Sequence, residues 1–360
     1  MKQAILSMQR VVNYGSVLQA WSLREMIRQA TGEDASFLDI QDEPVLNSAR
    51  SIRTRGDYAA EAAMSRSVFQ RGRRWVISRL SAYNKRLIKA FMRDELRLED
   101  QNDGPFDHVI VGSDEVFNHA KGVRLQLHGE IPQAGHIISY AASCGSASVA
   151  DVTPGDLPRL RQAMSGFDAI SVRDSGTEAY VRQLWDGTVH RHLDPVLMGP
   201  LHARKPRKVW LNKYLLVYAY GQRIRTAEEI NAIRDFAKKR KLIIVAMGGS
   251  QFWCDLYVPA SPMRMLDWFS HADYVVTDTF HGTIFSVISH CRFAVLLRPS
   301  NANKLASLLE DLGLTEQRVR QMEMLPSILE REIDYLAVDE RLAKERVRAK
   351  EYLKEQLRNA

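Results

Sequence analysis

Short apolar runs of strand length alternate with helical patterns along most of this chain, and this alternation restricts its fold more than any other feature. Residues 3–8 form the first apolar run, residues 17–30 follow with helical spacing, and a second apolar run occupies 35–40. Parallel strands need a crossover connection between them, and this is usually a helix. The alternation therefore predicts parallel sheets of the Rossmann type.

The alternation comes in two series, each long enough for one domain. Apolar runs at 108–112, 136–142 and 168–172 continue the first series, and a basic stretch with two prolines at 200–213 ends it. The second series is expected to have strands at 214–220, 242–247, 273–277 and 293–297, and helices at 227–240, 262–271 and 283–290.

These boundaries divide the 360 residues into predicted units. We expect an N-terminal Rossmann-like domain over 1–199, with a basic helical insertion at about 47–97. A linker at 200–213 leads to a C-terminal Rossmann-like domain over 214–315. Residues 316–360 form a helical tail, whose segment 338–358 has the spacing of one charged helix.

The positive charge is concentrated in one segment. Residues 50–97 contain 13 Arg or Lys and four Asp or Glu, a net +9, which leaves the rest of the chain at −2. The apolar residues of the predicted helix form one stripe, namely Val76, Leu80, Tyr83, Leu87 and Phe91. Such a local excess favours a polyanionic partner or an anionic membrane surface, and a solvated basic face is the other interpretation.

Cysteine usage and hydropathy indicate the compartment. Cys144, Cys254 and Cys291 are odd in number and far apart, which argues against a disulfide framework and a zinc site. Residues 1–8 are too short for a secretory leader, and no apolar run is long enough to span a bilayer. We therefore expect a cytoplasmic protein.

The strongest local signal is the segment that follows the strand expected at 273–277. Asp278 begins a turn that contains His281, and Gly282 and Thr283 open a helix. The free N–H groups and the dipole of a helix start bind anions, and a glycine lets a phosphate approach the backbone. His281 would stand at the lip, able to donate a proton. The alternative is that Thr283 only caps the helix and His281 is a turn residue.

Two other strand ends carry charged residues. Arg173 follows the strand at 168–172, where a guanidinium can hold a carboxylate or phosphate with two parallel hydrogen bonds. Alternatively it pairs with Asp174 or Asp194. Asp114 follows another buried strand and could act as a base or orient a sugar hydroxyl, although Asp is also a common helix N-cap.

Two weaker signals involve small residues. Gly15 and Asn13 lie between the first strand and the first helix, where a glycine permits close approach and an amide can bind a ligand. One glycine is far less specific than a dinucleotide fingerprint. Small residues at 138–145 leave room for a ligand or for helix packing. Cys144 has no histidine near it in sequence to activate its thiol, so we expect it to be inert.

Taken together and in this order, these segments resemble the polysaccharide pyruvyl transferase family, over about residues 1–315. The segments that carry the resemblance are Asn-Tyr-Gly-Ser-Val-Leu-Gln-Ala at 13–20, Gly-Ser-Asp-Glu-Val-Phe-Asn at 112–118, Ser-Tyr-Ala-Ala-Ser at 139–143, Ser-Val-Arg-Asp at 171–174, Leu-Asp-Pro-Val-Leu at 193–197, Thr-Asp-Thr-Phe-His-Gly-Thr at 277–283 and the stretch 303–314. The chain departs mildly from the family pattern at Phe117, Cys144, Asp174 and Thr279. The basic segment is not part of this set.

The resemblance implies an α/β fold of two facing Rossmann-like domains, similar to the GT-B glycosyltransferases, with a cleft between them. It implies phosphoenolpyruvate as the donor, no cofactor and no bound metal. The implied acceptor is a saccharide of a bacterial surface polysaccharide, either free or polyprenyl-linked. Two of its hydroxyls would receive the enolpyruvyl group as a pyruvate ketal. A polyprenyl-linked acceptor would bring the protein to the inner face of the cell membrane, with the basic segment as the contact.

The resemblance also implies roles for individual residues. The expected catalytic residues are His281, Asp114 and Arg173. The expected donor-binding residues are Arg173, His281, Gly282 and Thr283. The expected acceptor-binding residues are Asn13, Tyr14, Gly15 and Ser113.

Two other functions remain compatible with the sequence. One is a GT-B glycosyltransferase that uses a nucleotide sugar, because fold alone does not fix function. The other is a non-catalytic protein that binds a saccharide or a polyanion through the basic segment. The sequence contains no recognised nucleic-acid-binding motif, so nucleic acid is the least favoured partner.

Overall fold

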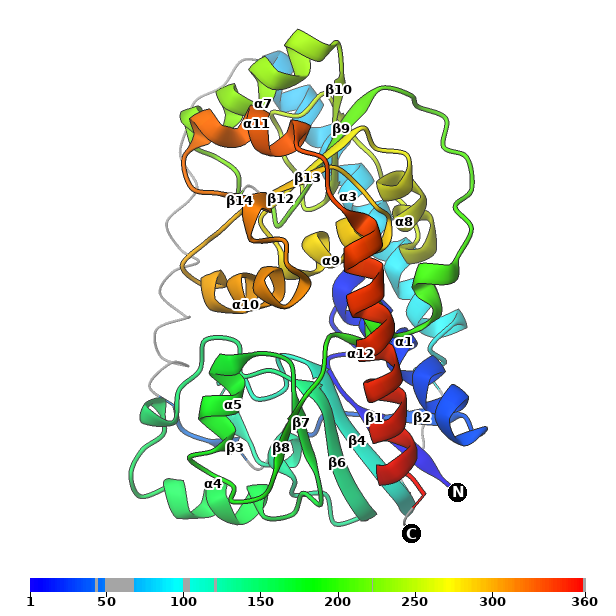
Figure 1. Cartoon of the computed structure of the whole chain (residues 1–360), viewed down its shortest axis with the longest axis vertical. Helices are drawn as coiled ribbons and strands as arrows, with labels where there is room; N and C mark the ends of the chain where they lie inside the picture. The colour runs from blue at the N-terminus through cyan, green and yellow to red at the C-terminus, as the bar shows by residue number, and fades with distance from the viewer. Residues whose placement is uncertain (43–44, 49–67, 100–103, 120–121, 222, 359–360) are drawn as a thin grey trace.

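The computed structural model describes residues 1–42, 45–48, 68–99, 104–119, 122–221 and 223–358. Two parallel six-stranded sheets, one in each half of the chain, lie one above the other in Figure 1. Helices cover the faces of both sheets. This confirms the predicted α/β architecture of two facing Rossmann-like domains with a C-terminal helix.

The N-terminal sheet has the strand order β2-β1-β4-β6-β7-β8. All its pairings are parallel, and β1 lies between β2 and β4. The strands are β1 Gln3–Leu6, β2 Ala35–Leu38, β4 Phe106–Asp114, β6 Ala134–Ala142, β7 Ile170–Val172 and β8 Val189–Arg191, and the main helices are α1 Tyr14–Thr31, α4 Leu157–Met164, α5 Ser175–Val181 and α6 Pro195–Met198.

The C-terminal sheet has the order β11-β10-β9-β12-β13-β14. The chain first builds outward from β9 through β10 and β11, and then returns to the other side of β9 with β12. The switch point between β9 and β12 is where open α/β sheets bind ligands, beyond the carboxyl ends of the strands. The strands are β9 Tyr214–Ala219, β10 Ile243–Gly248, β11 Leu256–Tyr257, β12 Tyr274–Thr277, β13 Phe293–Leu296 and β14 Arg318–Val319, and the helices are α7 Ala227–Arg240, α8 Pro262–Ser270, α9 Phe280–Ile288, α10 Ala302–Leu312 and α11 Leu325–Glu330.

Helix α9 begins at Phe280, three residues earlier than the sequence pattern predicts. Thr279 is the N-cap, because its backbone is extended and its hydroxyl accepts a hydrogen bond from the Gly282 amide at 2.9 Å. The expected cap, Thr283, lies inside the helix. His281 is therefore in the first turn of the helix and not in the preceding turn.

The basic segment contains the long helix α3, Val68–Asp94, and residues 49–67 of it lie outside the described part of the chain. The predicted apolar stripe is correct at Leu80 and Phe91, which pack on the core, and wrong at Val76 and Tyr83, which are exposed. Ile77, Asn84 and Ile88 are buried in their place. Both faces of this helix carry apolar residues, so the spacing alone did not show which face packs on the protein.

The C-terminal helix α12, Tyr335–Gln356, connects the two halves (Figure 1). Near its start, the Tyr335 ring stacks on His290 with centroids 4.4 Å apart. Near its end, the Tyr352 hydroxyl donates to the Ser139 carbonyl of β6 at 2.9 Å. Among the described residues, no helix is both long and apolar enough to cross a bilayer.

Candidate active site

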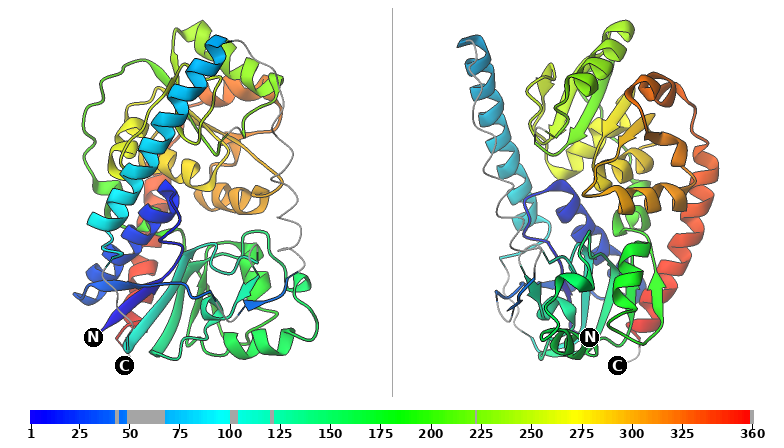
Figure 2. Two further views of the ribbon diagram at one scale, coloured as in Figure 1. Left: turned by 180° about the vertical axis from the view of Figure 1, so that it is seen from behind. Right: turned by 90° about the vertical axis from the view of Figure 1, so that its left-hand side faces the viewer.

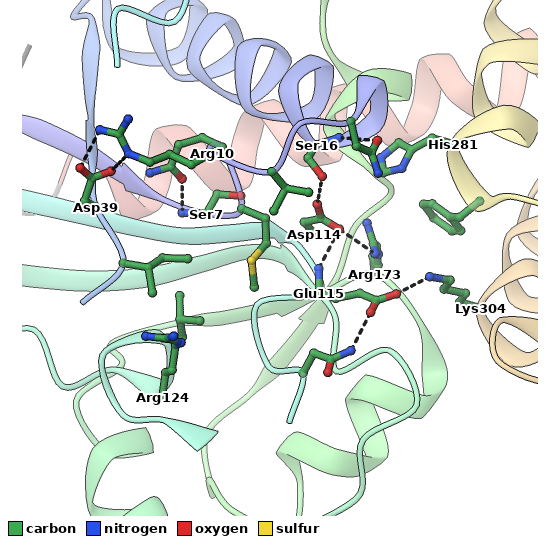
Figure 3. A pocket seen from close by; sticks show the side chains of 18 of the residues that line it. Ser7, Arg10, Ser16, Asp39, Asp114, Glu115, Arg124, Arg173, His281 and Lys304 are labelled. Atoms are coloured by element: carbon green, nitrogen blue, oxygen red, sulfur yellow. Dashed lines mark hydrogen bonds and ion pairs between the residues drawn. The ribbon is translucent and has the colours of Figure 1, made fainter. Parts of the chain in front are cut away.

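A cleft of about 580 Å³ lies between the two domains (Figure 3). It opens where the carboxyl ends of both sheets meet. The N-terminal domain lines it with the segments after β1, β2, β4 and β7, and the C-terminal domain lines it with Tyr220 after β9, with the start of α9 and with Lys304 of α10. Its volume is within the range typical of pockets for small-molecule ligands.

Arg173 follows β7 and is almost fully buried in the cleft wall. Its Nη1 donates to Asp194 Oδ2 at 3.0 Å, and its Nη2 is 3.7 Å from Asp114 Oδ1. The guanidinium lies 4.4 Å from the centroid of the Phe280 ring. Burial acts to lower the pKa of Arg173, but Asp194 and Asp114 more than offset this and raise it. The side chain is therefore a fixed cation that lies against an aromatic ring.

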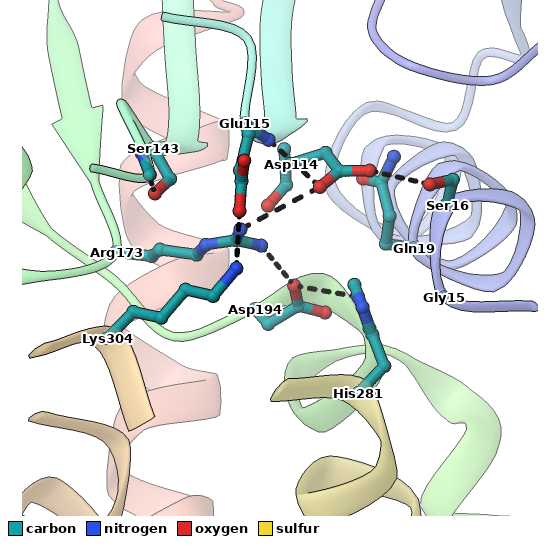
Figure 4. Close-up of polar contacts among 12 residues, drawn as sticks. Gly15, Ser16, Gln19, Asp114, Glu115, Ser143, Arg173, Asp194, His281 and Lys304 are labelled. Carbon is teal, nitrogen blue, oxygen red and sulfur yellow. Dashed lines mark hydrogen bonds and ion pairs between the residues drawn. The ribbon is translucent and has the colours of Figure 1, made fainter. Parts of the chain in front are cut away.

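His281, in the first turn of α9, faces Arg173 across a shared carboxylate (Figure 4). Its Nε2 is 3.5 Å from Asp194 Oδ2. The other side of the ring packs on Gly15, where an added Cβ would lie 2.2 Å from Nδ1. Gly15 therefore fits against the imidazole because it has no side chain.

Asp194 joins these two residues. It is completely buried, and it is the N-cap of α6, where its Oδ1 accepts a hydrogen bond from the Val196 amide at 3.0 Å. Burial alone would raise the pKa of Asp194, but His281 and Arg173 lower it below its usual value. A fixed carboxylate of this kind orients both the guanidinium and the imidazole.

Asp114 stands at the end of β4 with φ at 83°, a conformation that few residues other than glycine adopt. Its Oδ2 accepts a hydrogen bond from the Ser16 hydroxyl at 2.7 Å. Its Oδ1 accepts from the Glu115 amide at 2.9 Å. Strained backbone of this kind concentrates at functional sites, and here it directs a carboxylate into the cleft beside Arg173.

Lys304 and Glu115 form an ion pair across the cleft between the two domains. Glu115 also accepts a hydrogen bond from the Asn118 amide group at 2.7 Å. Burial would raise the pKa of Glu115, but Lys304 lowers it to about 2. The ammonium of Lys304 is 5.8 Å from the centroid of the Phe280 ring, so Phe280 lies against both Arg173 and Lys304.

Five of the predicted site residues do not line this cleft, namely Tyr14, Gly15, Ser113, Gly282 and Thr283. Thr283 is fully buried within α9, and the amide of Gly282 is already bonded to Thr279. A Cβ on Gly282 would lie 2.1 Å from Thr277 Oγ1, so this glycine serves the packing of the helix on β12. Ser113 is also fully buried, and its hydroxyl donates to the Ala141 carbonyl at 2.9 Å.

Tyr14 also points away from the main cleft. Its hydroxyl lies 2.5 Å from Asn84 Oδ1 and 2.7 Å from the Ala260 carbonyl, so it connects α1 with α3 and with the loop before α8. Asn13, in contrast, does line the cleft. Its side-chain oxygen caps α1 by accepting from the Gly15 amide at 2.7 Å.

The other end of the cleft has a different composition (Figure 3). Arg10 donates to Asp39 Oδ2 at 2.6 Å, and Arg124 Nη2 donates to Asp42 Oδ1 at 3.3 Å. The apolar side chains at this end are Met8, Ile40 and Leu127. We call this part, lined by these seven residues, the distal lobe.

The arrangement combines two cations, an imidazole and three carboxylates, those of Asp114, Glu115 and Asp194, around one end of a cleft. Such a set can bind an anionic ligand that has more than one charged group and can move a proton beside it. Among the described residues, no group of three or more His, Cys, Asp and Glu side chains could hold a metal ion. Sequence reasoning assigned no role to Lys304, Glu115 or Phe280. Glu115 lies in the segment 112–118, Phe280 in the segment 277–283 and Lys304 in the stretch 303–314, so all three belong to the segments that carry the family resemblance. Their proximity to one another arises only when the chain folds.

Solved structures of sugar enzymes are similar to this chain at low sequence identity. Trehalose 6-phosphate synthase of Burkholderia multivorans is 10% identical with a TM-score of 0.48, over 99% of this chain and 98% of that one. UDP-GlcNAc 2-epimerase of Methanocaldococcus jannaschii is 10% identical with a TM-score of 0.48, over 92% of each chain. An O-GlcNAc transferase mutant of Thermobaculum terrenum is 12% identical with a TM-score of 0.46, and the alignment covers 100% of this chain and 66% of that one.

No curated protein matches the chain. A family model, described as polysaccharide pyruvyl transferase, matches residues 13–300. The match includes both sheets almost completely, together with Asp114, Arg173, Asp194 and His281. Because it covers most of the sequence, this chain belongs to the polysaccharide pyruvyl transferase family.

Proposed function

We propose that this protein transfers the enolpyruvyl group of phosphoenolpyruvate to two hydroxyls of a saccharide, forming a pyruvate ketal. The observation that carries the proposal is the convergence of Arg173, His281 and Lys304 at one end of the interdomain cleft. Phosphoenolpyruvate has a carboxylate and a phosphate on one small carbon skeleton. A site for phosphoenolpyruvate therefore needs several preoriented cations and hydrogen-bond donors that lie close to one another.

The contacts of Arg173 indicate how the donor would bind. Its Nη1 is held by Asp194, whereas Nη2 has only the longer 3.7 Å contact with Asp114. The Nε atom has no hydrogen-bond partner among the described residues. The Nε atom is buried, so Nη2 is the group that a carboxylate or phosphate would contact. Lys304 supplies a second cation, and His281 supplies a proton donor on the same side.

The reaction requires one proton to move to carbon and one to phosphate. Protonation of the methylene C3 makes C2 electrophilic, and a saccharide hydroxyl then adds to C2. Phosphate leaves with its bridging oxygen, and a second hydroxyl of the same sugar adds to C2 and closes the ketal. One of the two hydroxyl protons returns to the acid that protonated C3. The other hydroxyl proton leaves on hydrogen phosphate. We assign the protonation of C3 to His281, and we assign to Asp114 the removal of the proton from the attacking hydroxyl.

The distal lobe is the proposed acceptor end. It belongs to the N-terminal domain, and Asp39 and Asp42 can accept hydrogen bonds from sugar hydroxyls. Asn13 also lines the cleft. We further propose that the product belongs to bacterial surface polysaccharide synthesis and that the acceptor can be polyprenyl-linked.

Calorimetric titration with phosphoenolpyruvate tests the donor assignment. Arg173→Lys keeps the charge and removes the planar fork, and His281→Asn keeps a polar side chain. Each variant should weaken binding about tenfold or more, since hydrogen bonds to charged groups contribute about 1.5–3 kcal/mol. The matched controls, Arg182→Lys and His290→Asn on the surface, should bind as the wild type does. Binding of a uridine diphosphate sugar without binding of phosphoenolpyruvate would instead indicate a glycosyltransferase.

A further inference from the structure

Helix α3 has an outer face that packs on none of the described elements. At 3.6 residues per turn, Trp75, Arg79 and Arg86 lie opposite the buried positions Ile77 and Asn84. We define the outer face as these three residues together with Val76, Tyr83 and Lys89. Figure 2 (right) shows α3 along the edge of the molecule, outside both sheets.

Nearly all the charged residues of this helix are basic. From residue 68 to residue 93 the sequence contains eight Arg or Lys and no Asp or Glu. Three of these cations, Arg79, Arg86 and Lys89, are exposed on the outer face. A solvated helix usually mixes both signs along its surface, because pairs three or four residues apart stabilise it. Helix α3 forgoes nearly all such pairs, because its one carboxylate, Asp94 at the C-terminal end, pairs with the adjacent Arg93.

Large apolar side chains lie among these cations. Trp75 is 63% exposed, Tyr83 is 51% exposed and Val76 is 48% exposed. The guanidinium of Arg79 lies 5.3 Å from the Trp75 ring centroid. Trp and Tyr favour the boundary between water and lipid, where the ring is buried and the polar edge is wet. Aromatic residues between cations on one helical face are typical of helices that lie on a membrane surface.

The helix is held rigidly from its other side. The Asn84 side-chain oxygen accepts from the Ala260 amide at 3.0 Å, and the Arg73 guanidinium donates to the Phe252 carbonyl at 2.9 Å. Arg74 covers the Phe252 ring at 4.6 Å. Arg73 and Arg74 are therefore engaged within the protein. Arg79, Arg86 and Lys89 of the outer face remain exposed, as does Lys85 beside it.

We propose that the outer face of α3 is a docking surface for an anionic lipid bilayer. The exposed cations favour a partner with negative charge on its surface. The exposed aromatic side chains favour a partner that also has an apolar interior. The face opposite, through Ser81 and Asn84, lines a small pocket of about 140 Å³ that shares Asn13 and Tyr220 with the active-site cleft. A bilayer bound to α3 would thus lie about one helix diameter, ~10 Å, from this small pocket. The proposal does not depend on the identity of the donor.

Co-sedimentation of the full chain with vesicles tests this surface. The vesicles are phosphatidylcholine alone, or phosphatidylcholine with about one third phosphatidylglycerol. The wild type should bind only the anionic vesicles. Arg79→Gln/Arg86→Gln/Lys89→Gln should weaken binding about 100-fold, because each cation near an anionic surface contributes about fivefold. Trp75→Ser/Tyr83→Ser keeps the charge and should also weaken binding at least tenfold.

The matched control removes the same charge elsewhere. Lys238→Gln/Lys239→Gln/Lys241→Gln, at the exposed end of α7, should change vesicle binding less than twofold. The urea unfolding midpoint should be the same for every variant, which shows that each is folded. This control needs no ligand, so a failure of the donor assignment would leave the vesicle result unaffected. Absence of wild-type binding, or an equal loss in the control, would overturn the proposal. So would binding to DNA in place of vesicles through the same residues.

Discussion

At the residue scale, one buried carboxylate organises the donor end of the cleft. Asp194 Oδ2 is 3.0 Å from Arg173 Nη1 and 3.5 Å from His281 Nε2, so a single oxygen positions both side chains. The carboxylate is in turn fixed by its cap on α6. If the guanidinium reorients, the buried Asp194 loses its closest charged partner, which costs several kcal/mol. The site is therefore preorganised before any ligand binds.

Gly15 is the residue that tests this preorganisation. In Gly15→Ala the new Cβ would lie 2.2 Å from His281 Nδ1, so the imidazole must move away from Asp194. We expect phosphoenolpyruvate binding to weaken about tenfold or more, with a change in unfolding free energy below about 2 kcal/mol. Calorimetry and urea unfolding measure the two effects. The control is Gly155→Ala, where the added Cβ has no atom within 4 Å. Unchanged binding in Gly15→Ala would show that the position of His281 does not matter.

The Lys304–Glu115 pair gives a pH-dependent prediction. The pKa of Glu115 is about 2 in the folded protein and 4.5 in its ordinary state. The carboxylate therefore contributes stability that is fully present above about pH 4.5 and is lost as the pH falls toward 2. Lys304→Met removes the main cause of the lowered pKa. We expect this variant to be less stable by about 1–3 kcal/mol at pH 7, with a smaller difference from the wild type at pH 3.

Urea unfolding at both pH values measures this difference. Glu115→Gln in the Lys304→Met background removes the uncompensated carboxylate and should recover part of the stability lost at pH 7. A deficit that is equal at pH 7 and pH 3 would show that Glu115 is not the group responsible.

At the scale of the element, two helices differ from their sequence patterns for identifiable reasons. Helix α9 begins at Phe280 because the Thr279 hydroxyl caps it, and this cap is local. The register of α3 depends on its partners in the fold. Ile77 packs in the core of the C-terminal domain, and Asn84 bonds to Tyr14 and Ala260. A buried asparagine is not expected from hydrophobic spacing, so the spacing alone misplaced Val76 and Tyr83 on the buried face.

Asn84 should therefore be important for stability although it is polar. Asn84→Ala leaves the Ala260 amide, whose residue is buried, without its side-chain partner. An unsatisfied buried N–H costs about 1–3 kcal/mol, so the urea midpoint should fall by a corresponding amount. Lys85→Ala, at the next and exposed position, should change stability by less than about 0.5 kcal/mol. If the two variants have equal stability, Asn84 does not fix α3 to the protein.

At the scale of the whole molecule, α12 makes the two domains one structural unit. Its first turn contacts the C-terminal domain through Tyr335, and its last turns reach β6 through Tyr352. One hydrophobic core contains residues of both sheets, such as Ile5 and Leu216, together with Leu353 of this helix. The cleft between the domains is therefore held at a defined width.

A core substitution in α12 tests this coupling. Leu353 is completely buried, so Leu353→Ala should cost about 2–5 kcal/mol. Hydrogen exchange should increase in strands of both sheets, because the helix supports both. Leu336→Ala is the same change on the same helix at a position that is 74% exposed, and it should have little effect. Faster exchange in one sheet alone would show that the domains unfold separately.

The sequence by itself determined the two βα series and the strand ends that carry the polar motifs. These features are local, because strand and helix periodicities and the residues that follow a strand depend on neighbours a few positions apart. It also placed Asp114, Arg173 and His281 at such ends, and the structure brings these three to one cleft.

Only the tertiary structure decided which partners these residues have. Asp194 is 21 positions from Arg173, Lys304 is 189 positions from Glu115, and Asn84 is 70 positions from Tyr14. No periodicity relates residues at such separations. Their contacts arise when the two sheets, α3 and α12 pack together, because burial of the apolar faces fixes where the polar side chains meet. The same packing buried Gly282, Thr283 and Ser113 and turned the basic, aromatic face of α3 outward.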